Sequence, residues 1–338
     1  MAHKRDSRRA DTDVEVQRVY DGDLYVRVNS VGSGVTRPFL LIPGIGVSST
    51  YFERLAPNLN EFGPVYALDL PGFGGVPHPG TALGIREYAD LVGRVIDELG
   101  LDDPIVVGHS MGSQVVSDLA SRRTDISTLV LIGPVVNPAE RSLVTQARRF
   151  LGAAWHEPGR VKALAISAYL FCGFKWFSRV LPKMMSYPIE DALPKITANT
   201  LVIRGEFDGV APRDWVRRMG ELLPTSQLWE MPGAAHSVMY AHADEVARLC
   251  VAHARGELGE TADPATLNVS AVSEDETDDA LDATTTAKAL GGRLTEAVGV
   301  ITDDDDLIAQ GKSTHAAALA ESASDDAAHG ETEEPGDR

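Results

Sequence analysis

The sequence has few cysteines and no long apolar run, and each shortage excludes a class of protein. Cys172 and Cys250 are the only cysteines among 338 residues, so the fold is not built on a disulfide framework and suits a reducing compartment. No run of about twenty apolar residues exists, and we therefore expect no membrane-spanning segment. Residues 1–14 are rich in charge and lack the apolar core of a signal peptide, which predicts a flexible arm on a cytoplasmic protein. None of the nine histidines stands at a metal-binding spacing from cysteines or carboxylates, so we expect neither a metal nor another cofactor.

The net charge of −18 is carried almost entirely by the end of the chain. From Glu257 onward there are 21 acidic and 4 basic residues, whereas the preceding part carries 28 acidic and 27 basic residues. This change of composition near Gly256 predicts a folded domain over 15–257 and an acidic tail over 258–338. A nearly neutral domain gives no reason to expect a nucleic-acid partner, and the tail would repel one.

Short apolar runs alternate with helical patterns through the domain. Such runs suit central parallel strands buried on both faces. Residues Ile85 to Leu99 have a helical apolar stripe that stops at Gly100, and Glu15 to Val31 has the pattern of two strands that turn at Asp21-Gly22. The alternation predicts an α/β fold with a doubly wound, mostly parallel sheet. The apolar runs are Pro38–Ile42, Pro64–Leu68, Ile105–Val107, Thr128–Ile132, Thr200–Ile203 and Gln227–Met231.

One apolar run leads directly into a Gly-x-Ser-x-Gly motif. Ile105 to Val107 is followed by Gly108-His-Ser-Met-Gly112 and then by residues that favour a helix. This order places Ser110 on a tight turn between strand and helix, with its hydroxyl lifted out at the end of a sheet. Gly108 and Gly112 flank the serine because a side chain at either position would press on the turn. We predict that Ser110 is a nucleophile; the alternative is an ordinary turn at the end of a strand.

A nucleophilic serine needs a base and a carboxylate, and both are present downstream. The loop after Thr200–Ile203 carries Glu206 and Asp208, of which Asp208 is favoured because Gly209 and a helix start at Pro212 place it at the tip. The loop after Gln227–Met231 carries His236, which we predict accepts the Ser110 proton while Asp208 fixes its tautomer.

Three other polar residues near these motifs are expected to be structural. His242 could replace His236 as the base, but its position before an expected helix, Ala243 to Ala254, favours a surface histidine. His109 precedes the serine and is expected to point the other way on the turn. Asp69 precedes the Pro71–Gly74 turn and is expected to hold that loop.

The motifs together resemble the α/β-hydrolase family. They arrive in family order, with the serine, aspartate and histidine in that sequence, and span about residues 15 to 257. The resemblance implies an oxyanion hole made by the backbone N–H groups of Ile45 and Met111. In the family the loop after the third strand usually begins His-Gly, whereas here it begins Pro43-Gly44, a tolerable change because the role belongs to the backbone. The matching stretches are Leu40–Gly46, Ala67–Gly74, Gly108–Gly112, Leu201–Asp208 and Pro232–His236.

An insertion at about 137–194 lacks strand patterns and has helical segments interrupted by prolines. The family resemblance implies that it is a lid over the site. Its middle, Ala163 to Phe177, is apolar and aromatic; these side chains either pack the lid onto the domain, line an apolar pocket or touch a lipid surface. In each case we expect a largely hydrophobic, uncharged substrate.

The acidic tail has two parts. Glu257 to Thr286 has a composition typical of disorder. Residues at about 287–325 have helical spacing. Through Gly292-Arg-Leu-Thr-Glu-Ala-Val-Gly299 and Asp304-Asp-Asp-Leu-Ile-Ala-Gln-Gly-Lys312 they resemble the CsbD family of small bacterial stress-associated proteins, which implies a solvated helical appendage. The alternative is a solubilising acidic tail, and the tail's partner is unknown.

These patterns predict a serine hydrolase that cleaves a carboxylic ester or a related acyl compound through an acyl-enzyme. The same residues also support cleavage of thioesters, amides or C–C bonds, or perhydrolysis. Ser110 argues against epoxides and haloalkanes, for which an aspartate nucleophile would be expected. The other class of function is a hydrolase-like protein that binds a ligand without catalysis.

Overall fold

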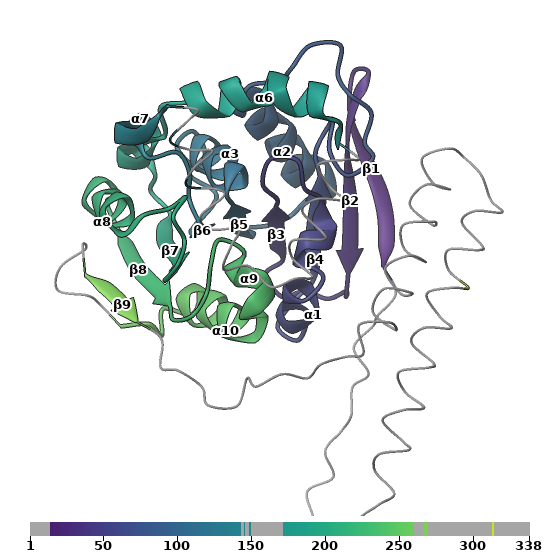
Figure 1. Cartoon of the computed structure of the whole chain (residues 1–338). Coiled ribbons are helices and arrows are strands. Elements are labelled where there is room, and N and C mark those ends of the chain that lie inside the picture. Colours follow the sequence, from purple (N-terminus) through teal and green to yellow (C-terminus); the bar gives the residue numbers. More distant parts are fainter. Residues whose placement is uncertain are drawn as a thin grey trace, which may run out of the picture. The chain divides into compact units, whose positions relative to one another are not determined.

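The computed structural model describes residues 14–142, 145, 149, 172–259, 266–269 and 313 (Figure 1). The chain divides into two units, Met1–Ala271 and Val272–Arg338, and the first contains all the described residues except Ser313. Three predicted segments lie almost entirely outside the described residues. They are the arm, of which only Val14 is described, the middle of the insertion up to residue 171, and the helical segment of the tail, of which only Ser313 is described.

Within the described residues the core is a nine-stranded sheet in the order β1-β2-β4-β3-β5-β6-β7-β8-β9. β1 pairs antiparallel with β2 and β2 with β4, while every later pair is parallel. The strands are β1 (Glu15–Asp21), β2 (Leu24–Val31), β3 (Phe39–Ile42), β4 (Val65–Asp69), β5 (Ile105–His109), β6 (Thr128–Ile132), β7 (Asn199–Gly205), β8 (Ser226–Met231) and β9 (Leu267–Val269).

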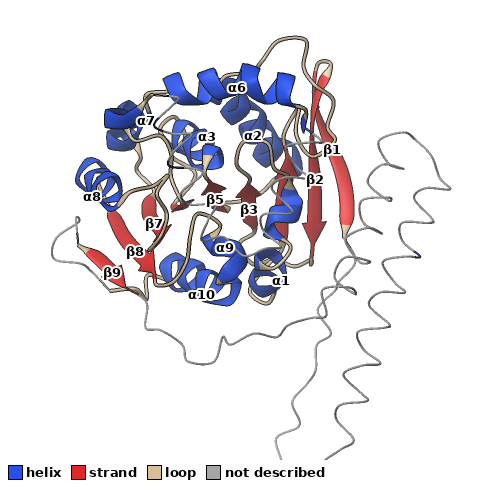
Figure 2. Ribbon diagram, in the orientation of Figure 1, coloured by secondary structure: helices blue, strands red, loops and turns tan. Residues whose placement is uncertain are grey.

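Helices cover both faces of the sheet, so the predicted doubly wound α/β fold is confirmed. Figure 2 shows α2 and α3 on one face of the strands and α1 and α10 on the other. Every residue of β3, β5 and β6 is buried, as expected for strands covered on both sides. The helices are η1 (Ser49–Phe52), α1 (Leu55–Asn60), α2 (Ile85–Leu99), α3 (Met111–Ala120), η2 (Pro138–Glu140), α6 (Phe174–Ser186), α7 (Ile189–Ala192), η3 (Leu193–Lys195), α8 (Arg213–Leu222), α9 (Val238–Ala241) and α10 (Ala243–Ala254).

Local patterns explain where α2 begins and ends. The Glu87 side chain accepts a hydrogen bond of 2.6 Å from the backbone N–H of Gly84, which satisfies a donor at the helix start. Gly100 ends the helix with φ of +60°, a left-handed conformation that favours glycine. The apolar stripe that includes Tyr88 and Val92 is buried. The helix has the bounds that the sequence predicts, Ile85 to Leu99.

The sheet continues beyond residue 257, where the sequence predicts the end of the domain. β9 was not predicted, because three residues with one polar member give no clear strand pattern. It pairs parallel with β8, and the Asn268 side chain donates a hydrogen bond of 3.1 Å to the Leu228 carbonyl.

The end of the insertion, from Cys172, is helical and is fastened to the domain. α6 places Trp176 against Gly72, where an added Cβ would lie 2.1 Å from the indole nitrogen, and the ring stacks on His78 at 4.8 Å. The Gln114 amide of α3 donates a hydrogen bond of 3.1 Å to the Met184 carbonyl. Among the helices that the structure describes, none is both long and apolar enough to cross a membrane.

Candidate active site

Ser110 lies on a strained turn between β5 and α3. Its φ of 54° and ψ of −119° form a backbone conformation that non-glycine residues rarely adopt. The turn is held on both sides, because the Ser110 N–H donates to the Ile132 carbonyl at 2.9 Å and the Ser113 hydroxyl donates to the Ser110 carbonyl at 2.5 Å. The structure thus places the predicted nucleophile at the carboxyl end of a central strand.

The two flanking glycines allow the strand and the helix to approach each other. A Cβ added to Gly108 would lie 2.5 Å from the Gly112 carbonyl oxygen, and one added to Gly112 would lie 2.2 Å from the Ile42 carbonyl oxygen. Neither position accepts a side chain without movement of the backbone.

Asp208 and His236 meet in a buried hydrogen bond. The Nδ1 atom of His236 lies 2.9 Å from Oδ2 of Asp208, and the residues are 7 % and 1 % exposed. They come from the loops after β7 and β8, so both lie at the same edge of the sheet as Ser110. An imidazole that donates Nδ1–H to a carboxylate keeps its Nε2 atom as a hydrogen-bond acceptor.

Backbone groups hold the Asp208 carboxylate in its ionised form. Its Oδ1 atom accepts hydrogen bonds from the N–H groups of Val210 at 2.9 Å and Ala211 at 3.0 Å. Burial alone would raise the pKa of Asp208, but His236, the Ala211 N–H and the charge of Arg204 together outweigh burial and lower that pKa. The Asp208 side chain points from its loop into the domain, since the residue is buried. Glu206, the other predicted candidate, is exposed and accepts a hydrogen bond of 3.0 Å from the Gly233 N–H.

Gly133, at the end of β6, makes room for the pair. A Cβ at this position would lie 2.9 Å from Cε1 of His236 and 3.1 Å from Oδ2 of Asp208. Its φ of +52° also favours glycine. This residue was not predicted, because a glycine after a strand has no pattern of its own.

One expectation is corrected: His109 does not point away from these residues. Its ring centre lies 4.9 Å from that of His236 and 5.9 Å from that of Tyr51, and Nε2 lies 3.2 Å from the His236 carbonyl oxygen. Burial, followed by the nearby His236, lowers the pKa of His109 to about 3. His109 is therefore neutral near pH 7 and donates its Nε2–H to the backbone of His236.

The segment around Gly44 lies against Ser110. A Cβ added to Gly44 would lie 3.0 Å from Cβ and 3.4 Å from Oγ of Ser110, so Gly44 allows the close approach. Ile45 follows it, and Met111 is the first residue of α3, where backbone N–H groups have no acceptor within the helix. Met111 therefore adjoins Ser110 in the chain, and Ile45 follows the glycine that packs against the Ser110 side chain.

Asp69 and His242 have surroundings that fit the expected structural roles. Asp69 accepts hydrogen bonds from the Ser49 N–H at 2.6 Å and from Arg27 and Asn29 at 2.8 Å. Arg27 also bonds the Gly74 carbonyl and so holds the following turn. His242 stands immediately before α10, which begins at the predicted residue.

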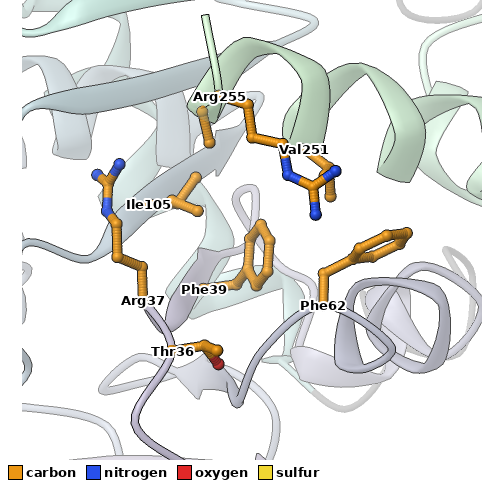
Figure 3. A pocket seen from close by; sticks show the side chains of 8 residues that line it. Thr36, Arg37, Phe39, Phe62, Ile105, Val251 and Arg255 are labelled. Carbon is orange, nitrogen blue, oxygen red and sulfur yellow. The ribbon is translucent and has the colours of Figure 1, made fainter. Parts of the chain in front are cut away.

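The opposite, amino-terminal edge of the sheet contains a different feature. A cavity of about 260 Å³ lies there beside the first residues of β3 and β5 (Figure 3). Its lining is Thr36, Arg37, Phe39, Phe62, Ile105, Val251, Ala254 and Arg255. No group of three or more histidine, cysteine or carboxylate side chains in the described part of the chain could hold a metal ion.

Comparisons with known proteins agree with the observed fold. The sequence model of the alpha/beta hydrolase family matches residues 39–249. A putative non-heme chloroperoxidase of Synechocystis is 24% identical over 247 residues, which are 63% of this chain and 89% of that protein. The 2-hydroxy-6-oxo-6-phenylhexa-2,4-dienoate hydrolase of Burkholderia cepacia is 25% identical over 250 residues, 61% of this chain and 82% of that one. The structure of a carboxylesterase from Bacillus subtilis has a TM-score of 0.60 at 18% identity and covers 72% of this chain and 92% of its own, which shows a shared fold.

Proposed function

This chain belongs to the alpha/beta hydrolase family, and from that premise we propose that it hydrolyses a carboxylic ester or related acyl compound with an apolar acyl group. One observation carries the proposal. The carboxyl ends of β5, β7 and β8 bring a serine on a strained turn to the edge that also carries a buried His–Asp hydrogen bond. The substrate edge of an open α/β sheet is the one formed by the carboxyl ends of its strands.

In the first step, Ser110 Oγ attacks the substrate carbonyl carbon and His236 Nε2 takes the hydroxyl proton. Asp208 holds the imidazole in the tautomer that this step requires and stabilises the imidazolium ion that forms. The imidazolium then gives its proton to the leaving oxygen as the ester C–O bond breaks, which leaves an acyl group on Ser110.

The backbone N–H groups of Ile45 and Met111 stabilise the negative charge that develops on the carbonyl oxygen. One such donor contributes on the order of 3 kcal/mol to the transition state. A water molecule, deprotonated by His236, then attacks the acyl-enzyme and releases the acid and free Ser110. All groups that move a proton in this scheme belong to the chain, and we propose no cofactor.

A second candidate is cleavage of a C–C bond beside a ketone. The name of the Burkholderia cepacia relative supports it, because a 2-hydroxy-6-oxo-dienoate contains no ester bond to hydrolyse. Perhydrolysis would replace the water with hydrogen peroxide, and the name of the Synechocystis relative favours this variant. Thioester cleavage and ligand binding without catalysis are further outcomes of the test.

The test is turnover by the purified protein on p-nitrophenyl esters of increasing acyl length. Each assay is repeated with a thioester, with a 2-hydroxy-6-oxo-dienoate and with hydrogen peroxide as acceptor. We expect the highest kcat/KM on an ester with an apolar acyl group. A higher kcat/KM on the dienoate would replace ester hydrolysis by C–C cleavage, and no turnover on any compound would favour a binding protein.

We also propose that residues after Ala271 do not belong to the catalytic unit and that the protein works in the cytoplasm. The first unit ends at Ala271, and both cysteines are buried and unpaired. A chain truncated after Ala271 should retain ester turnover, because a unit with its own core folds alone. A large loss of turnover with intact folding would assign part of the tail to the catalytic unit.

A further inference from the structure

A buried arginine holds the loop that carries Asp208. Arg204 lies in β7 and is 3 % exposed, although its neighbours in the strand are apolar. Its Nε donates to the Ala211 carbonyl at 2.9 Å, and its Nη2 lies 3.1 Å from the Asp208 carbonyl and 3.3 Å from that of Glu206. One guanidinium therefore contacts the beginning, the middle and the end of the 206–211 loop.

Glu230 balances the charge of Arg204 from the neighbouring strand. The two residues are paired in register across β7 and β8, and the Nη1 atom of Arg204 bonds Oε2 of Glu230. Arg213 binds the same carboxylate from the solvent side at 2.5 and 2.6 Å, and its side chain is 50% exposed. The buried pair is thus complete in its charge and hydrogen bonding without any group from outside the chain.

The Arg204–Glu230 pair lies beneath both loops of the candidate site. β8 ends at Met231, one residue after Glu230, and the chain then runs on to His236. The backbone N–H groups of Glu206 and Phe207 donate to carbonyls of that second loop, at 2.9 Å to Met231 and 2.8 Å to Ala234. A shift of the loop after β7 would therefore change the separation of Asp208 from His236.

We propose that Arg204 is a positioning residue for Asp208, kept in the core to aim the carboxylate at His236. The inference rests on the proposed role of Asp208 as the residue that orients the base. Stability gives no comparable reason for the pair, because two apolar side chains of similar volume at such sites are often as stable or more stable. The carbonyls of Ala211 and Asp208 are instead fixed by donors that an apolar residue does not have.

The test is the double substitution Arg204→Met/Glu230→Met, which removes both buried charges and keeps long apolar side chains in their place. Thermal unfolding and circular dichroism show whether the fold is retained. The low-field proton resonance of His236 Nδ1–H reports the hydrogen bond to Asp208 directly, and kcat and KM are measured on the best ester.

We expect a folded variant in which the resonance is lost or shifted and kcat falls on the order of 10²-fold with little change in KM, as for a misplacement of about 1 Å. The matched control is Arg213→Met, which removes the other arginine on Glu230 and leaves the contacts of Arg204 in place. It should keep the resonance and the kcat of the wild type.

The proposal is overturned if the double variant keeps both the resonance and kcat. If that variant does not fold, Arg204→Lys decides, because an ammonium group keeps the charge but cannot bond three separated carbonyls at once. A lysine variant with wild-type kcat would also overturn the proposal. The resonance needs no substrate. If the wild type shows the resonance but no turnover, and the double variant loses the resonance, the positioning role is supported while the hydrolase proposal fails.

Discussion

Two arginines bind loops at opposite edges of the same sheet, and water reaches only one of them. At the amino ends of β5 and β6, Arg37 bonds the Asp103 carbonyl at 2.9 Å and the Ser127 hydroxyl at 2.9 Å, with 34% of its side chain exposed. At the carboxyl ends, Arg204 makes a similar set of contacts to Glu230 and three carbonyls with 4% of its side chain exposed. A partly exposed ion pair contributes little to the free energy of unfolding and tolerates substitution, whereas a buried arginine fixes the backbone that it bonds.

The same contrast extends over both edges. The carboxyl edge places Ser110, His109 and the His236–Asp208 pair where glycines let backbone and rings meet closely. The amino edge has a cavity in which Arg255 stands over the Phe62 ring at 5.7 Å (Figure 3). The polar residues of the two edges are alike in type. Matched substitutions at both edges therefore distinguish an effect on kcat, expected at the carboxyl edge, from an effect on the free energy of unfolding, expected at either edge.

The largest difference is expected between Asp208→Asn and Asp103→Asn. An amide at 208 favours the wrong tautomer of His236, so kcat should fall on the order of 10⁴-fold. Asp103 accepts a hydrogen bond of 2.8 Å from the Ser127 N–H and has φ of 39°, which asparagine tolerates. Steady-state kinetics on the best ester should show wild-type kcat for Asp103→Asn; equal losses in the two variants would contradict the contrast.

The next difference is between two glycines that both lack space for a methyl group. A Cβ at Gly133 would lie 2.9 Å from the His236 ring, and one at Gly63 would lie 2.6 Å from the Arg37 carbonyl oxygen. Each alanine variant should lose roughly 1 to 3 kcal/mol of unfolding free energy through overpacking. Only Gly133→Ala should also lose kcat, on the order of 10²-fold, because His236 is displaced. Chemical denaturation and kinetics on both variants measure the two quantities, and an unchanged kcat in Gly133→Ala would remove Gly133 from the site.

A third difference, in the free energy of unfolding, is expected when either arginine alone is replaced by methionine. Arg204→Met leaves Glu230 buried with one partner and should cost about 3 to 5 kcal/mol of unfolding free energy. Arg37→Met should cost about 1 kcal/mol or less, because solvent screens its pair. Urea denaturation measures both, and similar costs would show that burial does not distinguish the two networks.

A fourth difference is a dependence of stability on pH that comes from His109. Its pKa is about 3 in the fold and about 6.5 when unfolded, so the unfolded chain binds a proton first and stability falls as the pH drops between these values. The slope approaches about 1.4 kcal/mol per pH unit for this residue. His109→Gln keeps a donor for the His236 carbonyl but does not titrate, and its unfolding free energy should depend less on pH than that of the wild type.

His253 provides the comparison for His109 at the amino edge. Burial lowers the pKa of His253 as well, while its ring nitrogens bond the Asn199 carbonyl at 3.0 Å and the Gln227 side chain at 3.2 Å. His253→Gln should also flatten the pH dependence of stability but leave kcat unchanged. An unchanged pH dependence in His109→Gln would contradict the buried, neutral state of His109.

Local sequence patterns were sufficient for the strands β1 to β8, for α2 and α10 and for the turn at Ser110, because each depends on residues close together in the chain. Asp208 was preferred over Glu206 by local turn residues alone, and the structure places the preferred carboxylate beside His236. Conversely, β9 was missed because a three-residue strand depends on its pairing with β8.

The supporting residues of the site were not predicted, since their roles exist only where distant segments meet. Gly133 matters because the loops after β7 and β8 converge on it, and His109 contacts His236 across 127 positions of sequence. Arg204 stands directly after the apolar run Thr200–Ile203, and this position alone indicates neither its burial nor its pairing with Glu230. Its partners, Glu230 and three backbone carbonyls, are set by the pairing of β7 with β8 and by the course of the 206–211 loop.

The most direct measurement is to react the purified protein with a fluorophosphonate and to locate the adduct by peptide mass spectrometry. An activated serine beside an oxyanion hole reacts with such a reagent, whereas an ordinary hydroxyl does not. We predict one adduct per chain, on Ser110, with no adduct in Ser110→Ala and full labelling in Ser127→Ala. An unlabelled wild type under conditions that label a control esterase, or an adduct on another residue, would contradict the assignment of Ser110 as the nucleophile.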